Sequence, residues 1–436
     1  MSKFSKLMII TLLLILASCN QPKPTKPPGD IEISQEAVEV SAVPDQPTDT
    51  SQPEDTNTPP DDSTPQPPTE VPQEIILTGD RVPLLPAGAA VDIRELHMMD
   101  QNIGWAISVD ANRIFHVLKT ESAANTWRDI SPPQPINPNS NWFTAEVNFS
   151  DSDHGWVSYN DSDLIWRTVD SGMTWEPSLL EYETRLESMI HSLDNDHVWL
   201  FQFLDAGMQK VHTALYSSSD GGATWTMLLD PLGAPAYSIQ GFDKTGVDFL
   251  DPGYGWLTRN FRGVSPDIRL DITLDGGTTW QALALTAPPS APDAFSNCSC
   301  GLSDPKIISR QKGMVKLECM CSEGGGNFTK NYLYQTVDGG VTWNIEYIPE
   351  GELHFIQGDV FFIINREIYR TAAASIDWEV VNTVNWDGQF SFIDESTAFG
   401  VAYNPDTDVY ALVETRDGCG KFTLIDTRII ESLSIR

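Results

Sequence analysis

The stretch Thr336-Val337-Asp338-Gly339-Gly340-Val341-Thr342-Trp343 sets the pattern for the folded part of this chain. The arrangement is Ser or Thr, any residue, Asp, any residue, Gly, any residue, Thr and Trp. It occurs in four clean copies, at Thr168–Trp175, Ser218–Trp225, Thr273–Trp280 and Thr336–Trp343. Four occurrences of one eight-residue pattern in 436 residues indicate a structural repeat.

The recurring positions each suit a tight turn between two strands. The Asp carboxylate can accept hydrogen bonds from the backbone N–H groups that follow it, and the Ser or Thr hydroxyl does so more weakly. The Gly two places later adopts a positive φ without a steric penalty, and Thr and Trp begin the next strand, where the indole can pack between neighbouring sheets. The residues in these roles are Asp170, Gly172, Trp175, Asp220, Gly222, Trp225, Asp275, Gly277, Trp280, Asp338, Gly340 and Trp343.

This pattern resembles the Asp-box, or BNR, repeat family. Three worn copies lie in the same register, at Thr120–Trp127, Thr371–Trp378 and Thr415–Phe422. Seven copies, mostly about 45–60 residues apart, have the period of a propeller blade. The resemblance implies an all-β fold, a seven-bladed β-propeller of four-stranded antiparallel blades, over residues 74–436. It also implies that each box lies on the turn between the third and fourth strands of a blade.

A second repeat, an apolar run followed by Gly-Trp, runs in phase with the first. Its clear copies are Gly104-Trp105, Gly155-Trp156, Val198-Trp199 and Gly255-Trp256, and its weaker echoes are Gly313-Met314, Val360-Phe361 and Phe399-Gly400. The first blade reads as four strands, Val91–Met99, Gly104–Val109, Arg113–Lys119 and Trp127–Ile130. We expect Ile75-Ile76-Leu77 to add an outer strand that closes the ring.

Residues 1–19 are typical of a bacterial lipoprotein signal peptide. Two lysines precede an apolar run that is too short to span a bilayer, and Leu16-Ala17-Ser18-Cys19 resembles a lipobox. The resemblance implies that Cys19 is lipidated and anchors the protein to the outside of the cell membrane. An ordinary secretory signal with a chance Cys is the alternative. Residues 20–73 are rich in Pro, Thr, Ser, Asp and Glu, which predicts a disordered tether.

The chain is strongly acidic, with 61 acidic and 27 basic residues and a formal charge of -34. Only 13 acidic and four basic side chains lie in the first 80 residues, so the excess extends through the folded part. This charge argues against a nucleic-acid partner, because phosphate recognition relies on basic patches. The acidity serves solubility and repulsion between neighbours, or it attracts cations or a basic partner.

Four cysteines form two Cys-x-Cys pairs, Cys298 with Cys300 and Cys319 with Cys321. Residues two apart on a strand point to the same face. In an exported protein, disulfides between the two pairs are the first interpretation. A four-thiolate metal site with shorter spacing than usual, or free thiols, are the alternatives. Cys419 has no evident partner in the sequence.

The boxes are predicted to be structural, so the candidate ligand face is the end of the propeller opposite to the box turns. It is built by loops between the second and third strands and by loops between blades, which combine aromatic, acidic and basic side chains suited to sugar or peptide binding. The candidate ligand-face residues are Tyr159, Asp161, Asp163, Arg259, Arg262, Tyr403, Asp406 and Asp408. The pairs Asp161/Asp163 and Asp406/Asp408 could also serve a glycosidase or hold Ca²⁺.

Signatures of catalysis are scarce in the sequence. Related sialidases carry an arginine triad and an Arg-Ile-Pro segment before the first box, and Phe261-Arg262-Gly263-Val264 is only a faint echo of that segment. We find no nucleophile elbow, P-loop, metal-spaced His pair or dinucleotide fingerprint, and we expect no catalytic residue, cofactor or metal.

The chain also resembles the propellers of photosystem II assembly factors and of sortilin-type receptors. This resemblance implies a non-enzymatic binding or scaffold propeller, lipid-anchored outside the cytoplasm, with a protein or polysaccharide partner at the cell envelope. A glycoside hydrolase of the sialidase kind, acting on surface glycans, is the alternative. The fold alone does not choose between these functions.

Overall fold

A computed structural model describes most of the chain from Ile75 onward. The described residues are 75, 77–90, 92–136, 144–207, 210–233, 239, 241–265, 267–323, 325–356, 360–371 and 377–431. They belong to one compact unit, and the predicted signal peptide with Cys19 and the predicted tether at 20–73 lie outside them. Within this part the elements are strands and one short helix, α2 (Ala294–Asn297), and no helix has the length and apolar character needed to cross a bilayer.

The described strands form six sheets, and five of these contain four consecutive antiparallel strands each. These strands are β1 (Asp92–Met98), β2 (Gly104–Val109), β3 (Phe115–Thr120) and β4 (Thr126–Asp129); β5 (Ala145–Phe149), β6 (Gly155–Tyr159), β7 (Ser162–Thr168) and β8 (Glu176–Thr184); β9 (Ser188–Ser192), β10 (Val198–Gly207), β11 (Lys210–Ser218) and β12 (Thr226–Leu229); β21 (Glu352–Ile356), β22 (Val360–Ile364), β23 (Glu367–Thr371) and β24 (Glu379–Thr383); and β25 (Asp387–Phe392), β26 (Ala398–Asn404), β27 (Val409–Thr415) and β28 (Thr423–Leu424).

The sixth sheet has eight strands and joins two such sets through the pairing of β14 with β17. Its strands are β13 (Asp243–Phe249), β14 (Gly255–Val264), β15 (Arg269–Thr273), β16 (Gln281–Ala284), β17 (Cys298–Ile307), β18 (Gly313–Glu323), β19 (Gly326–Thr336) and β20 (Asn344–Ile348).

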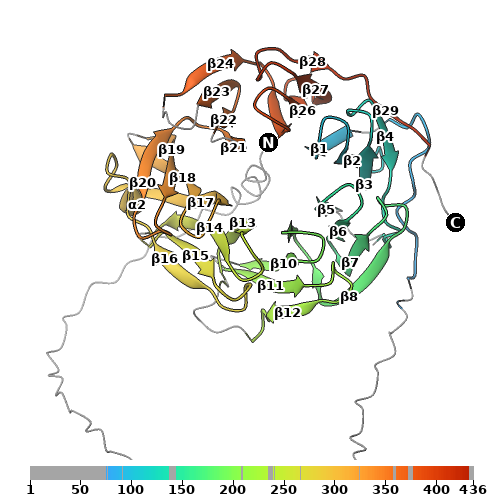
Figure 1. The fold of residues 1–436 in the computed structure, drawn as a ribbon, viewed down its shortest axis with the longest axis horizontal. Helices are drawn as coiled ribbons and strands as arrows, with labels where there is room; N and C mark the ends of the chain where they lie inside the picture. The colour runs from blue at the N-terminus through green and yellow to red at the C-terminus, as the bar shows by residue number, and fades with distance from the viewer. Residues whose placement is uncertain are drawn as a thin grey trace, which may run out of the picture. The chain divides into compact units, whose positions relative to one another are not determined.

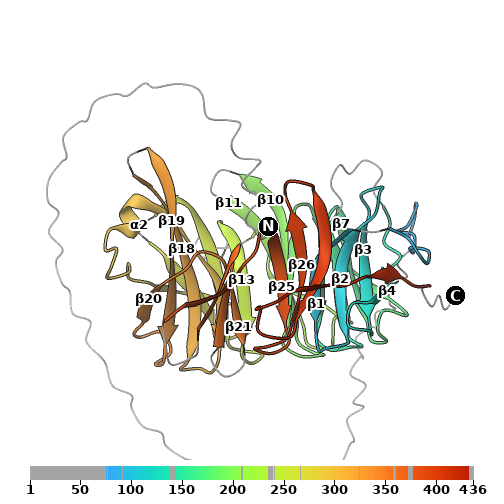
Figure 2. The same ribbon diagram turned by 90° about the horizontal axis from the view of Figure 1, so that it is seen from above.

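The strand sets follow one another around a ring, with the first strand of each set innermost (Figure 1). Seen from the side, the strands of the different sets run along a common direction (Figure 2). This is the architecture of a β-propeller, and it confirms the all-β prediction. Because each sheet is covered on both faces, its second strand is an almost continuous apolar run, as in β22 with the sequence VFFII.

The hydrophobic cores lie between neighbouring strand sets. One cluster, with Trp105 and Trp166, joins β1–β4 to β5–β8, and another, with Trp127 and Phe399, joins β25–β28 back to β1–β4. In the described part seven clusters of this kind link the successive sets around the ring. Each set therefore depends on its neighbours for burial of its apolar side chains.

The two sequence repeats are in phase because their side chains meet across the boundary between sets. The indole Nε1 of Trp156 donates to the carbonyl of Gly221 in the next box turn, at 2.8 Å. Trp199 makes the same contact with Gly276 at 2.7 Å. Trp156 and Trp199 thus each hold the box turn of the following set.

Strand pairing places the first residue of the second repeat opposite the first residue of each box. The pairs are Gly104 with Thr120, Gly155 with Thr168, Val198 with Ser218, Gly255 with Thr273, Gly313 with Thr336, Phe361 with Thr371, and Ala398 with Thr415. The last two echoes are therefore Phe361-Phe362 and Ala398-Phe399. The expected doublets Val360-Phe361 and Phe399-Gly400 were each displaced by one residue, and the fully buried Phe362 and Phe399 take the Trp position.

Residues from the C-terminal end, rather than the N-terminal segment, add the outer strand to the first set. Strand β29 (Arg428–Ile429) pairs in parallel with β4, and the N–H of Ile430 donates to the carbonyl of Trp127 at 2.8 Å. The predicted closing strand at residues 75–77 was wrong, because Ile75 and Leu77 belong to no strand and instead pack against the cluster of Trp105.

Two glycines allow the steric cost of a side chain in a turn to be distinguished from the cost of its positive φ. Gly172 and Gly325 both have positive φ, of +78° and +87°, but a Cβ at Gly172 would lie 2.7 Å from Ile130, whereas a Cβ at Gly325 would meet nothing within 4 Å. We expect Gly172→Ala to lower the free energy of unfolding by about 3 kcal/mol and Gly325→Ala by about 1 kcal/mol. Chemical denaturation measures both, and equal losses would contradict the close packing of box turns on the preceding set.

Candidate functional site

Each clean box forms the same hydrogen-bonded turn at one end of its strand set. In the first of them, Thr168 Oγ1 donates to Asp170 Oδ1 at 2.8 Å and Gly172 N donates to Thr168 Oγ1 at 2.9 Å. The N–H of Thr174 donates to Asp170 Oδ1 at 2.8 Å. The same three contacts recur in the other clean boxes. These carboxylates are occupied by their own turns, which leaves them poorly placed for catalysis.

The worn boxes keep the turn with substitute groups. Ser122 Oγ accepts from the N–H of Thr126 at 2.9 Å, in place of the missing carboxylate. Ala124 and Cys419 occupy the Gly position with φ of +62° and +71°, a conformation that side chains disfavour. Burial raises the pKa of the Cys419 thiol to about 12, so this cysteine is an unreactive part of the turn.

The box turns are bound to the loops that join the first and second strands of their own sets. The N–H groups of Ser171, Gly221 and Gly276 donate to the carbonyls of Asp153, Asp196 and Gly253 at 2.9–3.0 Å. We call this end of the ring the box face. The opposite end, which carries the loops between second and third strands and the connections between sets, is the ligand face.

A cluster of aromatic and charged side chains lies on the ligand face where β25–β28 meets β1. The rings of Tyr403 and Tyr410 are 4.6 Å apart, and the guanidinium of Arg94 lies 3.7 Å from the centre of the Tyr410 ring. The hydroxyl of Tyr403 donates to Asp408 at 3.2 Å. Cation–π stacking and this hydrogen bond hold a partly exposed surface in one arrangement, so the surface is preorganised.

Arg366 extends the same surface from the neighbouring set. Its Nε donates to Asp387 Oδ1 at 2.9 Å, which raises the pKa of the guanidinium, and Asp406 acts on it electrostatically. Asp406 and Asp408 are exposed in the loop between β26 and β27. The structure thus brings the sequence candidates Tyr403, Asp406 and Asp408 together, and adds Arg366.

Two candidate ligand-face residues are buried instead of facing solvent. Tyr159 is 0% exposed in the cluster between β1–β4 and β5–β8, where burial raises the pKa of its hydroxyl. Arg259 is 3% exposed and forms a two-pronged ion pair with Asp271. Both side chains lie on the strand face that packs against the preceding set, so their expected exposure was wrong.

The remaining candidates are dispersed. Asp161 is half-buried in the turn between β6 and β7, with φ of +53°, and its N–H donates to the carbonyl of Thr184. Asp163 is exposed on β7. The side chain of Arg262 lies outside the described part. No group of His, Cys, Asp or Glu in that part is arranged to hold a metal ion, the Asp pairs included.

Sequence reasoning missed an acidic cluster near the centre of the ring. Glu352, the first residue of β21, has its pKa raised to about 7, mainly by burial and then by the nearby Asp304. His354 Nε2 lies 3.8 Å from Glu352 Oε1, and burial lowers the pKa of this histidine to about 4. The sequence shows these residues only as isolated charges, because β17 and β21 are separated by three intervening strands.

The raised pKa of Glu352 predicts a pH-dependent gain in stability for Glu352→Gln. A carboxyl whose pKa is higher in the folded than in the unfolded protein stabilises the fold at low pH and loses that contribution as pH rises through 7. Since 37% of this side chain is exposed, screening limits the effect. We expect the variant to be about 1 kcal/mol more stable than wild type at pH 8 and equal to it near pH 5. Urea denaturation at both pH values checks this, and equal stability at pH 8 would contradict the perturbed carboxyl.

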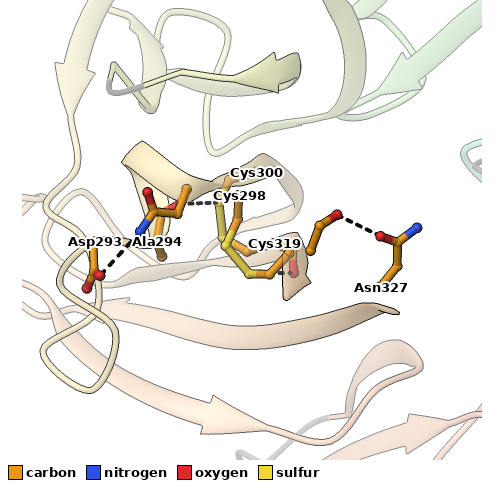
Figure 3. The surroundings of a disulfide bond; sticks show 9 residues. Asp293, Ala294, Cys298, Cys300, Cys319 and Asn327 are labelled. Atoms are coloured by element: carbon orange, nitrogen blue, oxygen red, sulfur yellow. Dashed lines mark hydrogen bonds between the residues drawn. A yellow bond between two sulfur atoms is a disulfide. The ribbon is translucent and has the colours of Figure 1, made fainter. Parts of the chain in front are cut away.

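The structure joins the two Cys-x-Cys pairs by disulfides between directly paired strands. Cys298 bonds to Cys321 and Cys300 to Cys319, with Cα–Cα separations of 4.3 and 4.1 Å (Figure 3). All four sulfurs are buried in the cluster that joins β13–β16 to β17–β20, beneath α2. The bridges fasten β17 to β18 at the end of the strands that lies on the ligand face.

A cavity of about 680 Å³ lies on the rim between the first two box turns. Its apolar lining includes Leu84, Met173 and Trp175, and its charged lining includes Lys119 and Arg128. The Lys119 ammonium is held by the carbonyl of Ser152 at 2.6 Å. The cavity is therefore bounded by box-turn residues and is separate from the ligand face.

Solved structures similar to this chain include proteins of different kinds. YCF48 from Cyanidioschyzon merolae is 17% identical over 64% of this chain and 83% of that chain, with a TM-score of 0.43. The GH74 enzyme of Niastella koreensis is 12% identical over 76% of this chain and 62% of that chain, with a TM-score of 0.34. The β-propeller domain of the trilobed protease from Pyrococcus furiosus is 10% identical over 78% of this chain and 96% of that chain, with a TM-score of 0.44. A scan of protein-family models and a search of curated proteins found no match.

Proposed function

We propose that this chain is a non-enzymatic binding scaffold at the cell envelope, with a protein or polysaccharide partner on its ligand face. In this proposal the eight-stranded sheet counts as two blades, so that seven Asp-box blades form the ring. Cys19 carries the lipid that holds the protein to the outer side of the membrane, and residues 20–73 act as its tether.

One observation carries the non-enzymatic assignment: Arg259 is buried and committed to Asp271. A sialidase-like hydrolase would need this arginine free to bind a substrate carboxylate. Arg366, an exposed arginine of the ligand face, is likewise paired, with Asp387. The aromatic pair Tyr403 and Tyr410 suits recognition of a partner surface.

Partner binding is tested by capture with matched variants of the full chain. The ligand-face variant combines Tyr403→Ala, Asp406→Asn and Asp408→Asn. The control combines Val337→Ser and Val341→Ser, because these side chains are 72% and 81% exposed on the box face. We expect envelope components retained by the wild type and the control to be lost from the ligand-face variant. Retention by all three proteins would contradict a partner site on this face.

The hydrolase alternative is tested with a panel of chromogenic glycosides, sialosides included. We expect no turnover above that of the ligand-face variant. Turnover that Asp406→Asn or Asp408→Asn reduces would show that this loop carries catalytic carboxylates and would overturn the scaffold assignment.

The anchor is tested by fractionating cells that produce the wild type or Cys19→Ala. We expect the wild type in the membrane fraction with an acylated N-terminal cysteine by mass spectrometry, and the variant without the acyl group. An unmodified chain that starts at a residue other than Cys19 would show that the ordinary secretory signal is correct.

A further inference from the structure

One arrangement of three side chains recurs in the described part of the chain. An arginine guanidinium lies over an aromatic ring and also bonds to a carboxylate. On the ligand face, Arg94 lies 3.7 Å from the centre of the Tyr410 ring, and its Nη2 donates to Asp92 Oδ2 at 3.0 Å. The same arrangement is formed by Arg310 with Tyr254 and Asp251, and by Arg370 with Phe362 and Glu395. We call this arrangement the arginine stack.

Tyr403 and Asp408 repeat the ring and the carboxylate of an arginine stack beside the one that contains Tyr410. Tyr403 is paired directly with Tyr410 across β26 and β27, so their rings share one face of the sheet, 4.6 Å apart. The hydroxyl of Tyr403 donates to Asp408 Oδ1 at 3.2 Å. Among the described residues no cation lies over the Tyr403 ring, and none donates a hydrogen bond to Asp408 Oδ2.

The two arginines close to this pair already have partners. Arg94 is held by Tyr410 and Asp92, and Arg366 Nε donates to Asp387 Oδ1 at 2.9 Å. The carboxylate of Asp408 is exposed, and Tyr403 is only partly buried. A guanidinium from another molecule can therefore reach this ring and this carboxylate.

The chemistry of the pair favours a guanidinium over other groups. A guanidinium is planar, so it stacks on a ring and directs N–H donors to a carboxylate in the same plane, whereas an ammonium is a compact point charge. The rings of Tyr403 and Tyr410 are inclined by 32°, and Arg94 covers Tyr410, so the two rings offer no common flat platform to a sugar. The exposed carboxylates of Asp406 and Asp408 repel an anionic glycan.

We propose that Tyr403 and Asp408 bind the guanidinium of an arginine on a partner protein, which completes a second arginine stack on the ligand face. This assignment rests on the proposed binding function and selects a protein over a polysaccharide.

Fluorescence anisotropy of the full chain with two labelled peptides, Gly-Arg-Gly-Arg-Gly and Gly-Lys-Gly-Lys-Gly, tests the assignment at low ionic strength. We expect the wild type to bind the arginine peptide about fivefold more tightly than the lysine peptide, because only arginine stacks on the ring. Tyr403→Leu and Asp408→Asn should each reduce this preference to less than about twofold. Asparagine tolerates the positive φ of +53° at position 408, so Asp408→Asn keeps the turn.

The control variant is Asp163→Asn, which removes one exposed carboxylate from β7 and should leave the preference unchanged. Equal affinity of the wild type for the two peptides would overturn the arginine site. A preference that survives in both test variants would also overturn it, since the attraction would then be diffuse.

The envelope partner separates this assignment from the scaffold proposal. Treatment of the envelope extract with phenylglyoxal, which modifies guanidinium groups, should abolish retention by the wild type. Retention that resists phenylglyoxal but is lost after periodate oxidation of the extract would mean a polysaccharide partner. That result would end the arginine site and leave the scaffold standing.

Discussion

A chain that ends at residue 425 is expected to lose about 5 kcal/mol of unfolding free energy. The removed segment contains Ile429, which is 3% exposed in the cluster between β25–β28 and β1–β4. It also contains the hydroxyl of Thr427, which donates to the carbonyl of Ala124 at 2.8 Å, and backbone contacts of β29 with Asn125, Trp127 and Gly88. Burial of one Ile contributes about 2 kcal/mol and each hydrogen bond about 1 kcal/mol.

Denaturation in urea measures this loss, and a chain that ends at residue 431 is the matched control. We expect the control to keep wild-type stability because β29 and its contacts remain. We also expect the shorter chain to bind a hydrophobic dye, since the cluster of Trp127 and Phe399 loses part of its cover. A chain ending at 425 with the stability of the control would contradict the closing role of β29.

Removal of both disulfides should have an effect of similar size. The two bridges join cysteines that are separated by 23 and 19 positions in the sequence. Closing a single loop of this length stabilises a protein by about 3 kcal/mol, because it lowers the entropy of the unfolded chain. Because one loop is nested inside the other, the second bridge adds less. We expect replacement of all four cysteines by alanine to lower the unfolding free energy by about 4 kcal/mol.

The control for this experiment is Cys419→Ala, which removes a buried thiol outside the bridges and should change the stability by about 1 kcal/mol. Reductant should lower the denaturation midpoint of the wild type but not that of the variant without the four cysteines. A wild-type midpoint that does not respond to reductant would contradict the bridged pairs.

The box turns are the part of the fold that the sequence predicts best. The hydrogen bonds that shape such a turn are local, as in Asp170, which accepts from groups at most four residues away. A pattern of eight residues therefore contains all of the information, and even the substituted Thr120–Trp127 turn could be recognised. That the two Cys-x-Cys pairs are bridged to each other was also predicted, since residues two apart on a strand share a face. Which cysteine bonds to which was not, because it depends on the register between β17 and β18.

Non-local contacts were harder to predict, for physical reasons. Side chains alternate between the two faces of a strand, so Tyr159 and Arg259 point to the opposite face from their immediate neighbours. The alternation does not show which of the two faces packs against another sheet. In Val360-Phe361-Phe362 three consecutive apolar residues give no sign of which one occupies the Trp position of the repeat. The strand register, in which Phe361 pairs with Thr371, decides it. The acidic cluster of Glu352 and Asp304 depends on two strand sets meeting, so no single stretch of sequence contains it.

The position of a bound partner tests the scaffold account most directly. Hydrogen–deuterium exchange of the full chain, with and without the partner captured from envelope extracts, would locate it. The account predicts protection at the ligand-face ends of β18, β21 and β26 and unchanged exchange in the turns at Asp170, Asp220, Asp275 and Asp338. Protection confined to those turns would contradict it.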